Sequence, residues 1–279
     1  MSTLSYRLGL PAWGFPGWRD RYFYDAPSRL ANYASVFNAV EGNTTFYGIP
    51  DPKTIARWRD AVAGTDFKFC LKLPREVTHD ERADFKTLAA FLRAIEPLGN
   101  HLGPLLVQFP ADIGPAEIAR IDATLTQIAA GLSTVVEVRH PAFFSAPALL
   151  APTLEQHNAG RVVLDAQALH RGDREHPEVV AALHKKPDLP VLADTTGNPA
   201  FIRLVLHPDE ASNASTLDEW VRHAERWLRE GDDLWMFIHC PNNLHCPPFA
   251  RDFHRRLVTV RPGAGHLSEW PVPEQIGLL

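Results

Sequence analysis

The feature that most constrains the fold is an alternation, repeated eight times, of short apolar runs with longer segments of helical periodicity. The strand-like runs occupy residues 6–10, 39–43, 67–73, 104–109, 134–138, 161–165, 201–206 and 234–239. Apolar residues with helical spacing follow each run, as at Leu30, Tyr33, Ala34 and Phe37. The eight units between Tyr6 and Leu257 average about 31 residues, a typical length for the strand–helix repeat of a parallel barrel.

This repeat predicts an α/β fold made of one (β/α)8 barrel, TIM-like and with parallel strands. An open doubly wound sheet is the alternative, but its G-x-G-x-x-G fingerprint is absent, because Gly9, Gly14 and Gly17 are spaced differently. We therefore expect residues 1–279 to form a single domain, with the barrel at about 5–260 and an irregular C-terminal tail at 261–279.

Charge and composition restrict the partners. The chain has 33 acidic and 28 basic side chains, and its net charge of -5 argues against bulk binding to nucleic acid or anionic membranes. It contains no apolar stretch of the roughly 20 residues that a membrane helix needs, and its first residues lack a signal core. Three scattered cysteines do not make a disulfide framework. We expect a cytoplasmic protein with no membrane partner, and its oligomeric state stays open.

The parity of each strand predicts which side chains enter the barrel, because alternate residues of a barrel strand point into the lumen. The charged residues assigned to the lumen in this way, or by their place at a strand end, are Lys68, Lys72, Arg139 and Arg203 against Glu41, Glu137 and Asp165. Most follow the carboxyl ends of strands, where barrel enzymes assemble their active sites. Four basic against three acidic groups favour an anionic or strongly polar ligand. The alternative is a set of buried ion pairs that only fills the barrel.

The same strand ends carry a series of short sequence words in a fixed order. They are Gly9-Leu10-Pro11-Ala12-Trp13, Val40-Glu41-Gly42-Asn43-Thr44-Thr45-Phe46-Tyr47, Phe69-Cys70-Leu71-Lys72-Leu73-Pro74, Thr78-His79, Leu105-Leu106-Val107-Gln108-Phe109-Pro110 and Val136-Glu137-Val138-Arg139-His140-Pro141. With these words the chain resembles the DUF72 (YecE-like) family, and the resemblance implies a TIM-like barrel. Two departures are a missing Thr-Ser pair after Gly9 and a histidine, His207, two residues later than in the family's Arg-Leu-His-Gly word.

The candidate catalytic residues are the carboxylates Glu41, Glu137 and Asp165. Burial raises the pKa of one carboxyl group and a neighbouring cation lowers that of another, which is an arrangement that acid–base chemistry uses. Glu137, beside Arg139, is expected to stay ionised and to act as a base or a metal ligand, whereas Glu41 is either acid or base. A glycosidase needs two carboxylates at a defined separation, which the sequence does not give.

The candidate ligand-binding residues are polar or aromatic and lie at or near strand ends. They are Trp13, Asn43, Tyr47, Lys72, His79, Gln108, Arg139, His140, Arg203, His207, His239, Asn242 and Asn243. Lys72, Arg139 and Arg203 are expected to hold negative charge, while the amides orient the ligand and the aromatic rings stack on it. For any single aromatic residue the competing interpretation is a place in the core.

A divalent metal is a weaker expectation. His79, His140, His207 and His239 with nearby carboxylates are the ligand types of metal-dependent barrel enzymes, but no H-x-H or H-E-x-x-H motif is present. Cys240 and Cys246 are too far apart in sequence for a zinc knuckle.

The sequence thus favours an enzyme, of isomerase or hydrolase type, acting by acid–base chemistry on a small anionic or polyhydroxylated, sugar-like substrate at the barrel mouth. A nucleic-acid-binding protein or phosphodiesterase using the same basic pocket is one alternative. A non-catalytic ligand-binding module is the other.

Overall fold

Eight parallel strands form the centre of the molecule in the computed structural model, which describes residues 3–24, 28–193 and 199–271. These strands are β2 (Arg7–Leu10), β3 (Ala39–Gly42), β4 (Lys68–Leu71), β5 (Leu105–Gln108), β6 (Thr134–Glu137), β7 (Gly160–Asp165), β8 (Ala200–Val205) and β9 (Leu234–His239). Their order in the sheet is β4-β3-β2-β9-β8-β7-β6-β5. Each strand boundary lies within two residues of the position predicted from the sequence.

The two ends of this sheet meet between β4 and β5. Leu73 N donates to Leu106 O at 3.0 Å and Gly103 N donates to Phe69 O at 2.9 Å, in two short stretches of parallel pairing. The sheet is therefore a nearly closed barrel. The predicted (β/α)8 fold is confirmed, and the open doubly wound alternative is wrong.

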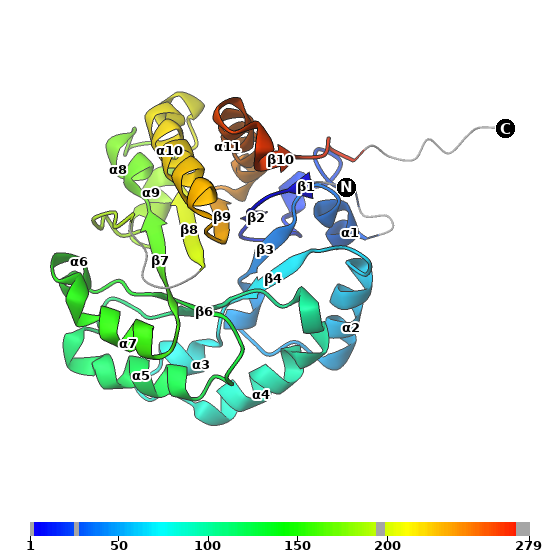
Figure 1. Cartoon of the computed structure of the whole chain (residues 1–279). Coiled ribbons are helices and arrows are strands. Elements are labelled where there is room, and N and C mark those ends of the chain that lie inside the picture. Colours follow the sequence, from blue (N-terminus) through cyan, green and yellow to red (C-terminus); the bar gives the residue numbers. More distant parts are fainter. Residues whose placement is uncertain (1–2, 25–27, 194–198, 272–279) are drawn as a thin grey trace.

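Helices surround the strands in Figure 1. They are α1 (Arg29–Ala34), α2 (Pro52–Ala61), α3 (Arg75–Thr78), α4 (Phe85–Ile95), α5 (Ile118–Thr126), α6 (Ala142–Ser145), α7 (Ala151–Gln156), α8 (Gln167–Arg171), α9 (Pro177–Leu183), α10 (Ala214–Glu230) and α11 (Cys246–Val260). Asp51 caps the start of α2, since its carboxylate accepts a hydrogen bond from Thr54 N at 2.9 Å. None of the helices in the described residues is both long and apolar enough to span a membrane.

The buried apolar residues form two main clusters, and a third, small one joins β7 and β8 to α8 and α9. The larger cluster combines strand and helix residues and lies between the barrel and its helices. A smaller cluster contains residues of strands alone: Ala39, Cys70, Leu106, Val135, Val162, Phe201, Trp235 and Phe237. Because it includes no helix residue, it fills the lumen. We call it the lumen cluster. The polar residues of the mouth follow it along the strands, toward their carboxyl ends.

The segment after α11 is more regular than the predicted tail. β10 (Gly265–His266) pairs antiparallel with β1 (Thr3–Leu4), and the Trp270 ring lies 5.8 Å from that of Phe23. Gly265 has φ +98°, and a β-carbon there would lie 1.9 Å from Thr3 O, so this pairing requires glycine. The part of the predicted tail at 272–279 lies outside the described residues.

Candidate functional site

Four ionisable side chains from four different strands meet at the carboxyl end of the barrel. Glu41, Glu137, Arg203 and His239 come from β3, β6, β8 and β9, and none is more than 4% exposed. Each lies two residues after a member of the lumen cluster, so strand parity directs it inward. We call these four residues the mouth network.

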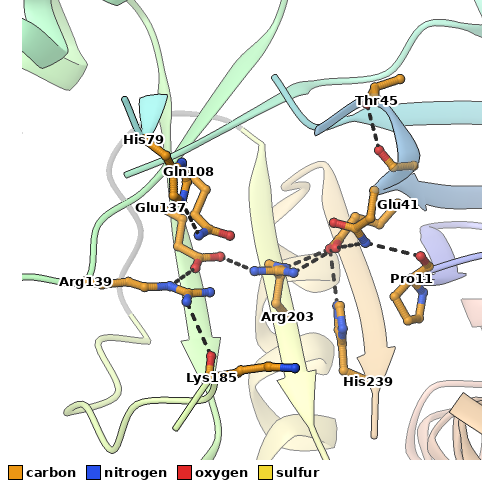
Figure 2. Close-up of polar contacts among 12 residues, drawn as sticks. Pro11, Glu41, Thr45, His79, Gln108, Glu137, Arg139, Lys185, Arg203 and His239 are labelled. Carbon is orange, nitrogen blue, oxygen red and sulfur yellow. Dashed lines mark hydrogen bonds and ion pairs between the residues drawn. The ribbon is translucent and has the colours of Figure 1, made fainter. Parts of the chain in front are cut away.

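Arg203 is the centre of the mouth network (Figure 2). Its Nε donates to Glu41 Oε2 and its Nη2 donates to Glu41 Oε1, both at 2.8 Å. Its Nη1 donates to Glu137 Oε2 on the other side. A single guanidinium therefore bridges two carboxylates, one of them in the bidentate geometry that arginine favours.

The remaining contacts of both carboxylates come from neighbouring side chains (Figure 2). Arg139 Nε donates to Glu137 Oε1 at 2.8 Å. Asn43 Nδ2 donates to Glu41 Oε1 at 2.8 Å, and His239 Nε2 lies 3.2 Å from Glu41 Oε2. Every carboxylate oxygen of Glu41 and Glu137 thus has a partner, which fixes both side chains in place.

The mouth network keeps both carboxylates ionised. Burial alone raises the pKa of Glu41, but Arg203 and His239 outweigh it and hold the pKa well below its usual range. Burial likewise opposes the ionised form of Glu137, but Arg203 and Arg139 lower its pKa to about 2. The sequence suggested that the two pKa values would be pushed apart. They are instead both lowered, because one arginine serves both groups.

Lys72 lies beside the mouth network without a carboxylate of its own. Its Nζ is 3.7 Å from the centroid of the Phe46 ring, and among the described residues no Asp or Glu oxygen lies within 4 Å of it. Burial, and then repulsion by Arg203, lower the pKa of Lys72 to about 7. Thr45 Oγ1 donates to Lys72 O at 2.7 Å and fixes the backbone there. Lys72 therefore changes its charge near neutral pH.

His79 and Gln108 form a second polar group next to Lys72. Gln108 Nε2 lies 3.4 Å from His79 Nε2, and the His79 ring lies 4.7 Å from the Phe46 ring. Burial, and then the nearby charge of Lys72, lower the pKa of His79 to about 4. His79 is consequently neutral at pH 7, and Gln108 ends β5 as predicted.

The sequence did not single out Lys186, which lies between α9 and β8. Burial, and then repulsion by Arg203, lower its pKa to about 8, while Glu41 and Glu137 oppose this change. Its carbonyl oxygen accepts a hydrogen bond from His170 Nε2 at 2.9 Å. The neighbouring Lys185 O accepts one from Arg139 Nη1 at 3.3 Å, which ties this segment to the mouth. No periodic pattern marks the segment, so no feature of the sequence singled out Lys186.

One predicted catalytic residue, Asp165, lies outside the lumen, and its assignment to the mouth was wrong. Its Oδ2 accepts a hydrogen bond from Trp220 Nε1 of α10 at 2.6 Å, and its Oδ1 accepts one from Gln167 N at 2.8 Å. Its outward parity is shared with Val163, which packs against the helices. Burial raises the pKa of Asp165, as expected for a carboxyl group beneath a helix.

Replacement of Asp165 by alanine is expected to lower the free energy of unfolding by about 2 kcal/mol, because Trp220 Nε1 and Gln167 N lose their acceptor. Urea unfolding at pH 7 measures this loss. Ligand affinity at the mouth should not change. Unchanged stability together with lost ligand binding would contradict this structural role and would indicate that Asp165 belongs to the functional site.

Two further residues predicted from the sequence, Lys68 in the lumen and His207 in the ligand site, also lie away from the mouth. Lys68 points inward but begins β4, so it lies at the opposite, amino end of the barrel, 3.5 Å from Asp66. His207 lies in the loop after β8, where its backbone N donates to Asn213 Oδ1 at 2.8 Å and its Nδ1 accepts from Asp209 N at 3.0 Å. His207 therefore anchors a loop.

The other predicted ligand-binding residues make contacts away from the mouth network. His140 Nδ1 accepts from Ala142 N, Asn242 Nδ2 donates to Glu178, and Asn243 O accepts from Trp18. Trp13 packs against Trp58 and Phe69 beneath α2, and Tyr47 is 82% exposed. Of the predicted set, the structure brings together Glu41, Asn43, Lys72, His79, Gln108, Glu137, Arg139, Arg203 and His239.

The charge balance of the mouth is more positive than the sequence indicated. Lys68 and Asp165 lie away from the mouth, whereas Lys186 lies near it. The mouth therefore has four basic side chains and two acidic ones: Lys72, Arg139, Lys186 and Arg203 against Glu41 and Glu137. Within the described part of the chain, no three His, Cys, Asp or Glu side chains are grouped so that they could hold a metal ion. The arrangement suits an anionic ligand bound by cations and amides.

The fold and the site define a (β/α)8-barrel protein with a buried charged network at the carboxyl mouth of its barrel. The family described as "Protein of unknown function DUF72" matches residues 7–274, and the chain belongs to it. It is 31% identical to the UPF0759 protein YecE of Escherichia coli (strain K12) over 277 residues, which cover 97% of this chain and 98% of the relative. The resemblance seen in the sequence words is thereby confirmed.

Solved structures of the same family share the fold. A DUF72 family protein from Enterococcus faecalis V583 has a TM-score of 0.68 at 18% identity, covering 98% of this chain and 100% of its own. One from Thermotoga maritima MSB8 has a TM-score of 0.64 at 19% identity, covering 90% and 98%. These similarities support the barrel fold.

Proposed function

We propose that the protein is an enzyme that binds a small anionic, sugar-like substrate at the barrel mouth and transfers a proton to or from it. The observation that carries this proposal is the excess of cations around two fixed carboxylates. A bound anion offsets this excess among buried side chains, where charge interactions are stronger than in water. Such a barrel mouth is also where enzymes of this architecture place their chemistry.

The side chains have different roles in this proposal. Arg139 and Lys186 hold the negative charge of the substrate, and Asn43 and Gln108 orient its hydroxyl groups. Glu41 and Glu137 hold Arg203 in place, since their low pKa values make them poor proton donors near pH 7. Lys72, whose pKa is about 7, transfers the proton. An isomerase or a hydrolase reaction is consistent with this division.

Replacement of Lys186 by glutamine is expected to weaken binding of ribose 5-phosphate about tenfold, because a charge-assisted contact is lost. Isothermal titration calorimetry at pH 7 measures the affinity. Lys185→Gln is the matched control, since this neighbouring lysine is exposed, and its affinity should stay within about twofold of the wild type. Equal affinities in both variants, or no binding of any phosphorylated or carboxylated metabolite to the wild type, would contradict the proposal.

A further inference from the structure

The side-chain amine of Lys72 is buried beside other cations, and such surroundings favour a nucleophilic lysine. We propose that Lys72 forms an imine with the aldehyde or ketone carbon of a small anionic substrate. This inference rests on the proposed function, because the same anion site must hold the substrate, and it names the substrate class: carbonyl compounds that carry a carboxylate or a phosphate.

The first support is the position of Lys72. It follows β4, whose end faces the mouth, and Thr45 Oγ1 holds its carbonyl oxygen at 2.7 Å, so the start of the side chain is fixed. The residue is 8% exposed, and its amine lies over the Phe46 ring at 3.7 Å. A fixed, dehydrated amine meets a bound substrate in one orientation.

The second support is the absence of a carboxylate partner. Lys68, on β4, has such a partner, because its Nζ lies 3.5 Å from Asp66 Oδ1. For Lys72 no carboxylate oxygen of the described residues lies within 4 Å. Among the charges that act on it, the cation Arg203 has the largest effect, and Glu137 and Glu41 oppose the effects of Arg203 and Arg139 without cancelling the lowering of its pKa. Burial next to other cations is one way in which proteins prepare a nucleophilic lysine. With a pKa of about 7, a large share of the Lys72 amine is neutral at pH 7.

The third support is the position of the other cations. Glu41 and Glu137 act electrostatically on both Lys72 and Lys186, and Arg139 donates to Glu137, so the three cations lie around one site. A carboxylate or phosphate held by Arg139 and Lys186 leaves the carbonyl carbon of a small substrate beside the Lys72 amine. The nitrogen lone pair then attacks that carbon, and a carbon–nitrogen bond forms. Both amine hydrogens leave with the carbonyl oxygen as water, so no oxidant or reductant is needed.

Reductive trapping tests this proposal on the full-length chain. The protein is incubated with pyruvate, or with glyceraldehyde 3-phosphate, and sodium cyanoborohydride, whose hydride converts an imine to a stable secondary amine. Intact-mass and peptide mass spectrometry should show one adduct, on Lys72, with at least one of these probes. Its yield should rise with a midpoint near pH 7, following the pKa of the amine.

Two variants make the result specific. Lys72→Arg keeps the positive charge but has no primary amine, and it should lose the adduct while it still binds the anion. Lys53→Arg changes an exposed lysine of α2 and should leave the adduct unchanged. An adduct on Lys186 instead of Lys72, equal labelling of exposed lysines, or no Lys72 adduct with either probe overturns the imine proposal.

A comparison of pyruvate with L-lactate tells whether the imine proposal alone is wrong or the proposed anion site as well. L-lactate has the carboxylate of pyruvate but no carbonyl carbon next to it. If pyruvate and L-lactate both raise the melting temperature but pyruvate gives no adduct, the anion site is supported and the imine proposal is wrong. If no phosphorylated or carboxylated compound raises the melting temperature, the proposed function itself fails.

Discussion

Replacement of Arg203 by methionine is expected to lower the free energy of unfolding by about 3 to 5 kcal/mol, the cost of leaving a buried charge without its partner. Glu41 and Glu137 stay buried in this variant, and together they lose the three hydrogen bonds that Arg203 donates. Urea unfolding followed by circular dichroism at pH 7 measures the loss. The variant should regain part of its stability as the pH is lowered toward 5, because protonation removes the unpaired charge.

The control for Arg203 is an arginine whose ion pair is exposed. Arg229 of α10 lies 3.2 Å from Glu225 and is 62% exposed, so Arg229→Met should change the stability by less than about 0.5 kcal/mol. If Arg203→Met costs no more than this control, the two carboxylates do not depend on Arg203 for their burial. The triple variant with Glu41→Gln and Glu137→Gln should be more stable than Arg203→Met alone.

The wild-type protein is expected to lose stability steeply in acid, through the same carboxylates. The pKa of Glu137 is about 2 in the folded chain against an ordinary value of 4.5, so the unfolded chain binds its proton first as the pH falls. The stability that this group contributes is complete above about pH 5 and is lost as the pH falls toward 2, a loss of about 3 kcal/mol. Glu41 acts in the same direction.

His239 makes this loss begin at a higher pH. Burial lowers its pKa to about 4 from 6.5, so the unfolded chain again binds the proton first. Urea unfolding at pH 7, 5, 4 and 3 should therefore give steadily falling free energies. Glu137→Gln, which has no charge to lose at this position, should show a flatter profile between pH 5 and 3. Parallel profiles for the two proteins would mean that the Glu137 carboxylate has no lowered pKa.

The sequence predicted most of the fold because one pattern, a short apolar run followed by a segment of helical periodicity, occurs eight times. Parity also placed Glu41, Glu137 and Arg203 in the lumen correctly. It could not place Asp165, because every residue from Val162 to Leu164 is apolar and neither face of β7 stands out. What holds Asp165 is Trp220, 55 residues further along the chain, and that contact depends on how α10 packs.

Position along a strand was the second source of error. Lys68 and Lys72 have the same parity, but four residues of rise put them at opposite ends of the barrel. Lys186 shows a third limit, since it reaches the mouth from an irregular connection whose path no local pattern specifies. The charge of the mouth was therefore predicted with the right sign, and its size became known only with the fold.

The sharing of Arg203 by Glu41 and Glu137 also bears on the order in which the chain assembles during synthesis. Glu41 is 162 residues from its partner, and Glu137 is 66 residues away. A ribosome therefore makes both carboxylates long before the arginine that they share, and N-terminal segments ordinarily fold first. A nascent half barrel would have to bury Glu41 without an arginine partner and Glu137 with Arg139 alone, which opposes its early compaction. Arrival of β8 removes that penalty for both carboxylates at once, so this one arginine couples the collapse of the barrel to synthesis of the chain as far as β8.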